Sequence, residues 1–168
     1  MKIIVGIDPG TYRTGFGVVQ VDGEGRTHHL NHGVFELNTK SSFYERLAQL
    51  GASLEELFKK YQPDSVVVEK IFLGKNVDSI FKLGHARGVI LYEAQKVRAE
   101  IFEYATRSVK KGVAGNGGAE KVEVQAALQF FLQIDKIKSM DASDALAMAV
   151  FHGIQMNHSQ LLKRARFI

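Results

Sequence analysis

The 168-residue sequence contains no cysteine, which excludes disulfide bonds, thiol nucleophiles and cysteine-ligated zinc. Any bound metal ion must therefore have oxygen or imidazole ligands. Long hydrophobic runs are also missing: segments such as GVILY and ALAMAVF fall far short of the roughly 20 residues that a membrane-spanning helix requires. The start, MKIIVGID, lacks the layout of a cleavable signal. We expect a protein without a membrane span that stays in the cytoplasm.

The composition is that of a folded globular protein, with 45% hydrophobic and 24% charged residues. The length fits a single domain, which we place over residues 1–156, followed by a basic, frayed tail over residues 157–168. The net charge of +4 permits a polyanionic partner, although many basic proteins bind no nucleic acid. The positions of the charges are therefore more informative than their sum.

The periodicity of the apolar residues predicts five strands and five helices. The first three strands form an antiparallel meander, and a helix with Ser41 or Ser42 as its N-cap leads to a β-branched strand of the parallel type. We therefore predict an α/β fold, a mixed five-stranded sheet with helices on both faces. The predicted strands are 2–8, 14–21, 27–38, 64–70 and 100–105, and the predicted helices are 41–61, 76–99, 106–113, 121–133 and 141–156.

Two glycines interrupt the helix predicted over residues 76–99. Gly84 and Gly88 are four residues apart and so lie on one face, and each costs about 1 kcal/mol relative to alanine inside a helix. This pattern predicts that another backbone approaches closely. The approach is either to the sheet of the same subunit or to a second subunit, and the sequence leaves both open.

Four carboxylates occupy related places in the predicted elements. Asp8 ends the first strand and Glu69 ends the fourth, while Asp141 and Asp144 are three residues apart on one face of the last helix. Each acid alone has an ordinary structural explanation, such as an Asx-turn, a helix N-cap or a favourable interaction with the helix dipole. If the first and fourth strands pair in parallel, however, all four converge.

Converging carboxylates repel one another, and cations bound between them relieve the repulsion. Hard oxygen ligands select Mg²⁺, for which Mn²⁺ can substitute. Two such ions about 3.5 to 4 Å apart stabilise the attacking and the leaving oxygens of an in-line phosphoryl displacement. The acids therefore predict a two-metal nuclease site.

Four segments resemble the motifs of the RuvC family of bacterial Holliday junction resolvases: GIDPGTYRTGFGVV, VVVEKIFLGKNVDSIFKLGHARGV, GNGGAEK and DASDALAMAV. The resemblance runs from Ile3 to about His152 with similar order and spacing. It implies an RNase H-like fold and a homodimer that cuts opposing strands of four-way junction DNA. It also implies nicks with 5′-phosphate and 3′-hydroxyl ends, and cooperation with the RuvA–RuvB branch-migration complex.

The same resemblance implies roles for individual residues. It makes the four acids the metal ligands, with one ion held by Asp8 and the 141/144 pair and a second shared by Asp8 and Glu69. Lys121 would stabilise developing charge at the scissile phosphate, and Lys110 would contact the DNA backbone. The remaining candidates for the DNA face are Phe72, which would stack on a base, together with Lys75, Asn76 and Lys82.

Three other functions remain open at this point. The first is an RNase H-like nuclease that acts on RNA or on an RNA/DNA hybrid. The second is an ATP-binding protein related to actin and the sugar kinases, because GIDPGTYRTGFGVV also resembles their first phosphate loop; the chain is too short for the second half that those proteins need. The third is a junction-binding module without catalysis, against which the complete set of acids argues.

Overall fold

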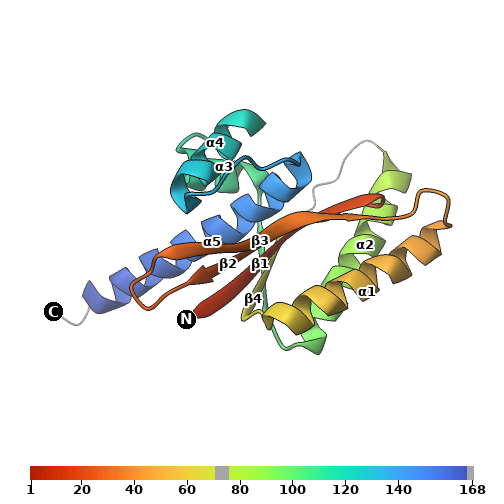
Figure 1. Ribbon diagram of the computed structural model, residues 1–168, viewed down its shortest axis with the longest axis horizontal. Coiled ribbons are helices and arrows are strands. Elements are labelled where there is room, and N and C mark those ends of the chain that lie inside the picture. Colours follow the sequence, from red (N-terminus) through yellow and green to blue (C-terminus); the bar gives the residue numbers. More distant parts are fainter. Residues whose placement is uncertain (71–75, 166–168) are drawn as a thin grey trace.

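The structure, a computed structural model, describes residues 1–70 and 76–165. Within these ranges the strands and helices follow one another in the predicted order: three strands, then a helix, a strand, a helix and a strand, and finally three helices (Figure 1). The strands are β1 (Lys2–Asp8), β2 (Arg13–Val21), β3 (Thr27–Glu36), β4 (Ser65–Glu69) and β5 (Glu100–Tyr104), and the helices are α1 (Phe43–Tyr61), α2 (Val77–Lys96), α3 (Thr106–Ala114), α4 (Lys121–Leu132) and α5 (Met140–Ala165).

The strands of the described chain form one five-stranded mixed sheet with the order β3-β2-β1-β4-β5. β1 pairs antiparallel with β2, which pairs antiparallel with β3, whereas β1, β4 and β5 are parallel. The predicted meander, the parallel strands and the α/β fold class are therefore confirmed. β1 and β4 lie in the centre of the sheet, which explains why both consist largely of buried valine and isoleucine.

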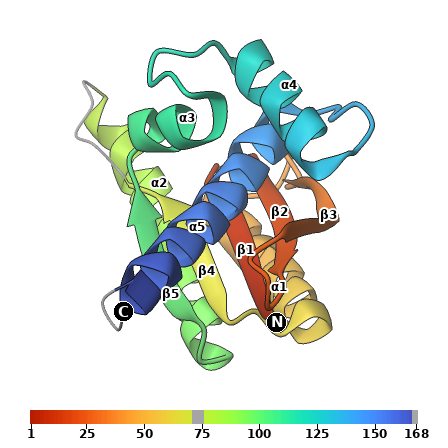
Figure 2. The same ribbon diagram turned by 90° about the vertical axis from the view of Figure 1, so that its left-hand side faces the viewer.

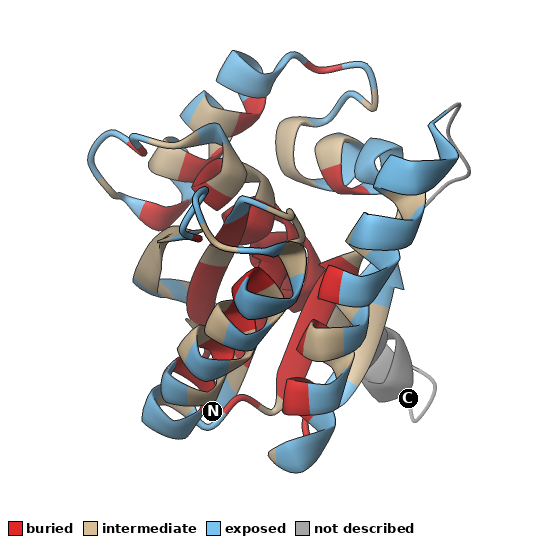
Figure 3. Ribbon diagram, turned by 90° about the vertical axis from the view of Figure 1, so that its right-hand side faces the viewer, coloured by how far each residue is buried: buried red, intermediate tan, exposed pale blue. Residues whose placement is uncertain are grey.

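Helices cover both faces of this sheet. α5 runs diagonally across one face, over β1 and β2, while α1 and α2 lie together on the other (Figures 1 and 2). Successive strand residues alternate between the two cores: Ile4 and Val67 pack toward α5, whereas Val5, Val66 and Val68 pack toward α1 and α2. Seen from the α1 and α2 side, the sheet is buried and the outer faces of both helices are exposed (Figure 3).

Glycines in β1 and β2 allow α5 to lie directly on the sheet. A Cβ atom on Gly15 would lie 2.0 Å from the backbone oxygen of Asp141, and one on Gly6 would lie 2.1 Å from that of Ala145. A Cβ on Gly17 would lie 2.4 Å from a Cα atom of the same helix. No real side chain fits at such distances, so these glycines set the depth at which α5 and its acids lie.

Helix ends show where the sequence patterns succeeded and where they failed. α1 begins after Ser42, whose hydroxyl accepts from Glu45 N–H while the Glu45 carboxylate accepts from Ser42 N–H, a capping box. The prediction that the last helix ends at residue 156 was wrong, since α5 continues to Ala165.

None of the helices in residues 1–70 and 76–165 combines the length and apolar character needed to cross a bilayer.

Gly84 and Gly88 do not pack on the sheet of their own subunit. Among the described residues, no atom lies within 4 Å of a Cβ built on either glycine. The first of the two explanations for these glycines is therefore wrong. Both lie in an open groove of about 1010 Å³ whose other lining residues are Leu47, Val77, Ile80, Phe81, His85, Val89 and Tyr92.

Candidate active site

The sheet brings the first two acids together. Because Ile7 is paired with Val68 in the parallel β1–β4 ladder, Asp8 and Glu69 follow as neighbours at the carboxyl ends of the two strands. This edge of a parallel sheet is where α/β proteins commonly place their functional side chains. The predicted convergence of these two acids is therefore present in the structure.

A buried arginine braces the turn that follows Asp8. Arg46 of α1 donates from Nε to the Thr11 carbonyl oxygen at 2.9 Å and from Nη1 to the Ser41 carbonyl oxygen at 2.6 Å. Inside the turn, the Thr14 hydroxyl donates to the Gly10 carbonyl oxygen at 3.0 Å. These bonds satisfy polar groups that the turn would otherwise leave unpaired, and they hold the chain next to Asp8 in one conformation.

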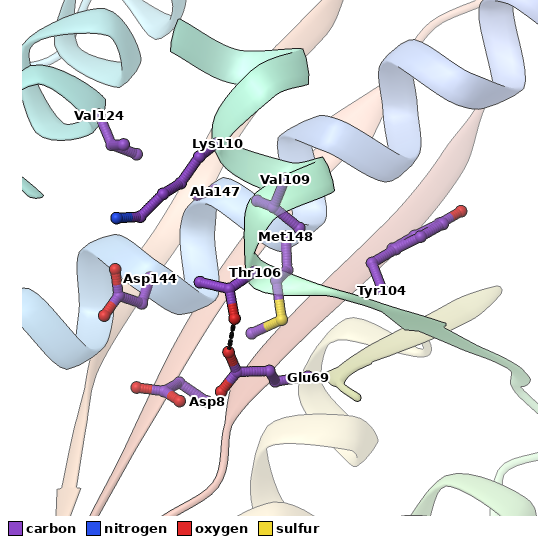
Figure 4. Close-up of a pocket in the computed structure, with 10 residues that line it drawn as sticks. All are labelled: Asp8, Glu69, Tyr104, Thr106, Val109, Lys110, Val124, Asp144, Ala147 and Met148. Atoms are coloured by element: carbon purple, nitrogen blue, oxygen red, sulfur yellow. Dashed lines mark hydrogen bonds between the residues drawn. The ribbon is translucent and has the colours of Figure 1, made fainter. Parts of the chain in front are cut away.

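α5 supplies the other two acids from its first turns. Asp144 lines a small cavity of about 40 Å³ together with Asp8 and Glu69, and Lys110 of α3 lines the same cavity (Figure 4). Asp141 lies one helical turn earlier, outside the cavity wall. The structure thus places three of the acids around one space and the fourth at its margin.

The charges of this cluster act most strongly on Asp8. Its pKa is raised from 3.8 to about 7, first by burial and then by the negative charges of Asp144, Glu69 and Asp141, while the positive charge of Lys121 opposes the shift. The other three acids are therefore close enough to repel the ionised carboxylate of Asp8. A carboxylate in this position gains greatly from a cation placed beside it.

Cationic side chains neutralise the acids of α5. Lys121 Nζ lies 2.7 Å from an oxygen of Asp144, a hydrogen bond that raises the pKa of Lys121. Arg13 Nε lies 3.0 Å from an oxygen of Asp141. Sequence reasoning missed Arg13, the first residue of β2. Its partner is 128 positions away in the chain, which no local pattern reveals.

Lys110 points into the cavity from α3. Its ammonium group donates to the carbonyl oxygen of Ala119 at 2.7 Å, so it ties α3 to the loop before α4. The structure therefore brings both predicted active-site lysines, Lys110 and Lys121, to the acidic cluster. Nearby, the hydroxyl of Thr106 donates to a carboxylate oxygen of Glu69, a contact that the sequence analysis did not anticipate (Figure 4).

The other predicted DNA-contacting residues lie away from this cavity or outside the described chain. Asn76 is the N-cap of α2 and accepts from Ser79 N–H at 3.1 Å, and Lys82 forms an ion pair of 2.6 Å with Asp78 on the same helix. Neither lines the cavity. Phe72 and Lys75 lie outside the described residues.

The donor set fits a hard divalent cation. Its ligands would be carboxylate oxygens, which Mg²⁺ and Mn²⁺ prefer, and the repulsion at Asp8 is the electrostatic condition that such an ion relieves. In the described part of the chain, no three acidic or histidine side chains lie at metal-ligand spacing. The pairs with Arg13 and Lys121 each engage one oxygen of Asp141 and Asp144, which leaves the other oxygen of each carboxylate available as a ligand.

A mixed sheet of this strand order, with acids at the ends of β1 and β4 and on the helix that crosses them, is the architecture of the RNase H-like nucleases. The sequence model of the family described as "Crossover junction endodeoxyribonuclease RuvC" matches residues 4–152. The chain belongs to this RuvC family. Its family membership and its fold are therefore established independently of the individual site residues.

The similarity to individual relatives extends over nearly the full length of both proteins. The chain is 55% identical to the RuvC protein of Bdellovibrio bacteriovorus, with 97% of this chain and 96% of the relative covered. It is 40% identical to that of a Geobacter species, with 98% and 99% covered. Thermus thermophilus RuvC in complex with a Holliday junction substrate superimposes with a TM-score of 0.88 at 28% identity, covering 95% of this chain and 97% of that one.

Proposed function

We propose that this protein is a Mg²⁺-dependent endonuclease that resolves four-way DNA junctions by paired, symmetric nicks. One observation carries the proposal: Asp8, Glu69 and Asp144 surround one cavity at the carboxyl edge of the sheet, with Asp141 close enough to act on Asp8. Membership of the RuvC family supplies the substrate class, since the superimposed Thermus relative was solved with a Holliday junction.

The chain's own residues contribute binding, orientation and charge. Mg²⁺ held by the four carboxylates would supply an activated water and a Lewis acid for the leaving oxygen. Lys121, which is paired with Asp144 in this structure, would lie close enough to a phosphate at the cavity to stabilise the negative charge that develops on it. Lys110 contacts the neighbouring DNA backbone from α3 while its bond to Ala119 limits its motion. The nick leaves a 5′-phosphate and a 3′-hydroxyl.

Symmetric cutting requires two sites, and the protein forms a homodimer through α2. What supports the dimer is the open groove around Gly84 and Gly88, where Val77, Phe81 and Tyr92 are 62%, 66% and 65% exposed. Apolar side chains this exposed are typical of interaction surfaces. The two glycines leave room for the backbone of a symmetry-related helix, and a two-fold axis places the active sites on opposing strands.

The family resemblance also suggests further contacts with DNA and with a partner complex. In the sequence, Phe72, Lys75 and Asn76 fall between β4 and α2, whereas Lys82 belongs to α2; we place all four on the DNA face. Lys82 contacts a phosphate only if its ion pair with Asp78 opens. Cooperation with a RuvA–RuvB complex is proposed on the resemblance alone.

Cleavage of an end-labelled synthetic four-way junction tests this function. Matched duplex, single strand and RNA/DNA hybrid are compared in Mg²⁺ and in chelator. We expect paired nicks in the junction alone, abolished by chelator and by Asp8→Asn but unaffected by Asp135→Asn, an exposed acid outside the site. Cutting of the hybrid would instead assign the protein to the ribonucleases, and loss of junction binding in Asp8→Asn would contradict the metal-binding role of Asp8.

A further inference from the structure

Thr106 makes a contact to the candidate active site that the family resemblance did not supply. Its hydroxyl donates to a carboxylate oxygen of Glu69, and both side chains line the cavity that holds Asp8 and Asp144 (Figure 4). Thr106 is the first residue of α3, directly after β5. Its bond therefore joins the carboxylate of one strand to the helix that follows the neighbouring strand.

The backbone of Glu69 is already fixed without Thr106. Glu69 is paired with Tyr104 in the β4–β5 ladder, and the N–H of Lys70 donates to the Tyr104 carbonyl oxygen at 2.9 Å. The remaining freedom of Glu69 lies in its side-chain torsions. Within residues 1–70 and 76–158, Thr106 provides the one side-chain hydrogen bond recorded to its carboxylate. The hydroxyl thus restrains the part of Glu69 that the sheet leaves free.

The helix that contains Thr106 does not depend on this hydroxyl. α3 is held by the buried side chain of Val109 and by Gly112, where a Cβ atom would lie 2.3 Å from the ring of Phe151. Thr106 itself is exposed, and substitutions at exposed positions usually change stability by less than about 0.5 kcal/mol. The bond to Glu69 therefore contributes to the arrangement of the site rather than to the stability of the fold.

We propose that Thr106 is a positioning residue that holds one oxygen of Glu69 so that the other is presented to a divalent ion in the cavity. This inference rests on the proposed function, because it assumes that Glu69 is a metal ligand. Hydrogen bonds to metal-ligating carboxylates fix their orientation, and their loss typically costs 10- to 100-fold in metal affinity. Because Thr106 is exposed to water, we expect the lower end of this range, about tenfold.

The test compares Thr106→Val, which keeps the branched shape but lacks the donor, with Thr106→Ser, which keeps the donor. Mn²⁺ affinity is measured calorimetrically on the DNA-free protein, and junction cleavage is measured across a range of Mn²⁺ concentrations. Thr106→Val is expected to weaken Mn²⁺ binding about tenfold. Its kcat falls at low Mn²⁺ and recovers at saturating Mn²⁺, while KM for the junction is unchanged. Thr106→Ser restores the wild-type affinity, and Thr39→Val, at an exposed threonine in a turn, has no effect.

Two results would overturn the positioning role. One is a wild-type Mn²⁺ affinity in Thr106→Val, and the other is equal loss in the Val and Ser variants, which would show that the site tolerates no change of shape there. Glu69→Gln separates this failure from a failure of the proposed function. If Glu69→Gln abolishes cutting while Thr106→Val binds Mn²⁺ normally, only the role of Thr106 is lost. If Glu69→Gln still cuts, the metal-binding role of Glu69 itself is wrong.

Discussion

Replacing Asp8 by asparagine is expected to stabilise the ion-free protein while abolishing its activity. The pKa of Asp8 rises from 3.8 to about 7 on folding, chiefly through burial and then through the neighbouring acids. One unit of pKa corresponds to about 1.4 kcal/mol, so the ionised carboxylate destabilises the folded state by about 4 kcal/mol above pH 7. The uncharged amide avoids most of this cost.

The sign of the effect follows from proton binding. Between pH 4 and pH 7 the folded protein retains a proton on Asp8 that the unfolded chain has released, so the contribution of Asp8 to wild-type stability falls as the pH rises through this window. The advantage of Asp8→Asn is therefore about 4 kcal/mol at pH 8.5 and about 2 kcal/mol at pH 5. At the higher pH this corresponds to a melting temperature about 10 °C above that of the wild type.

Urea unfolding in EDTA at the two pH values measures this difference directly. Asp135→Asn serves as the control, because Asp135 is exposed and lies outside the cavity. Added Mg²⁺ at about 100 times its dissociation constant should stabilise the wild type by roughly 2.7 kcal/mol and Asp8→Asn much less. The reasoning fails if the two proteins are equally stable in EDTA at pH 8.5, or if their difference does not shrink at pH 5.

Three further predictions concern other parts of the molecule. Lys121→Ala should lower kcat for junction cleavage about 100-fold, the usual effect of removing a donor to developing charge, and an unchanged single-turnover rate would contradict that role. The pKa of His152 is lowered by burial to about 4, so between pH 6.5 and pH 4 the wild type should lose about 3 kcal/mol relative to His152→Leu when both are unfolded in urea. Phe81→Glu should convert the proposed dimer to a monomer in sedimentation at micromolar concentration, whereas Phe130→Glu, at an even more exposed aromatic on α4, should not.

Much of the fold was predictable because its signals are local. Alternating or continuous β-branched residues identify the strands, and the Ser42 capping box identifies the start of α1. The meeting of Asp8 and Glu69 was predictable as well, since two parallel strands that both end in an acid must bring those acids to the same edge. These are consequences of periodicity and of strand direction, which the sequence expresses directly.

Other features depend on contacts between distant segments and were not predictable. Arg13 pairs with Asp141, and Thr106 bonds Glu69, only because the sheet and α5 bring them together. A glycine such as Gly15 gives no local indication that a helix backbone lies against it. The length of α5 was missed for a different reason: residues 157–165 are mostly polar and basic, so the apolar spacing by which the helix was identified stops at residue 156.

The acids of the site come from β1, β4 and α5, so the proposed set of metal ligands is complete only when the last of these elements has packed on the sheet. A fragment of the chain that stops before α5, whether from interrupted synthesis or from proteolysis, carries Asp8 and Glu69 but neither Asp141 nor Asp144. Such a fragment lacks two of the four proposed ligands and the helix that fills the glycine-lined face of the sheet. If the four acids act as proposed, nuclease activity therefore depends on the synthesis and packing of the last helix of the described chain.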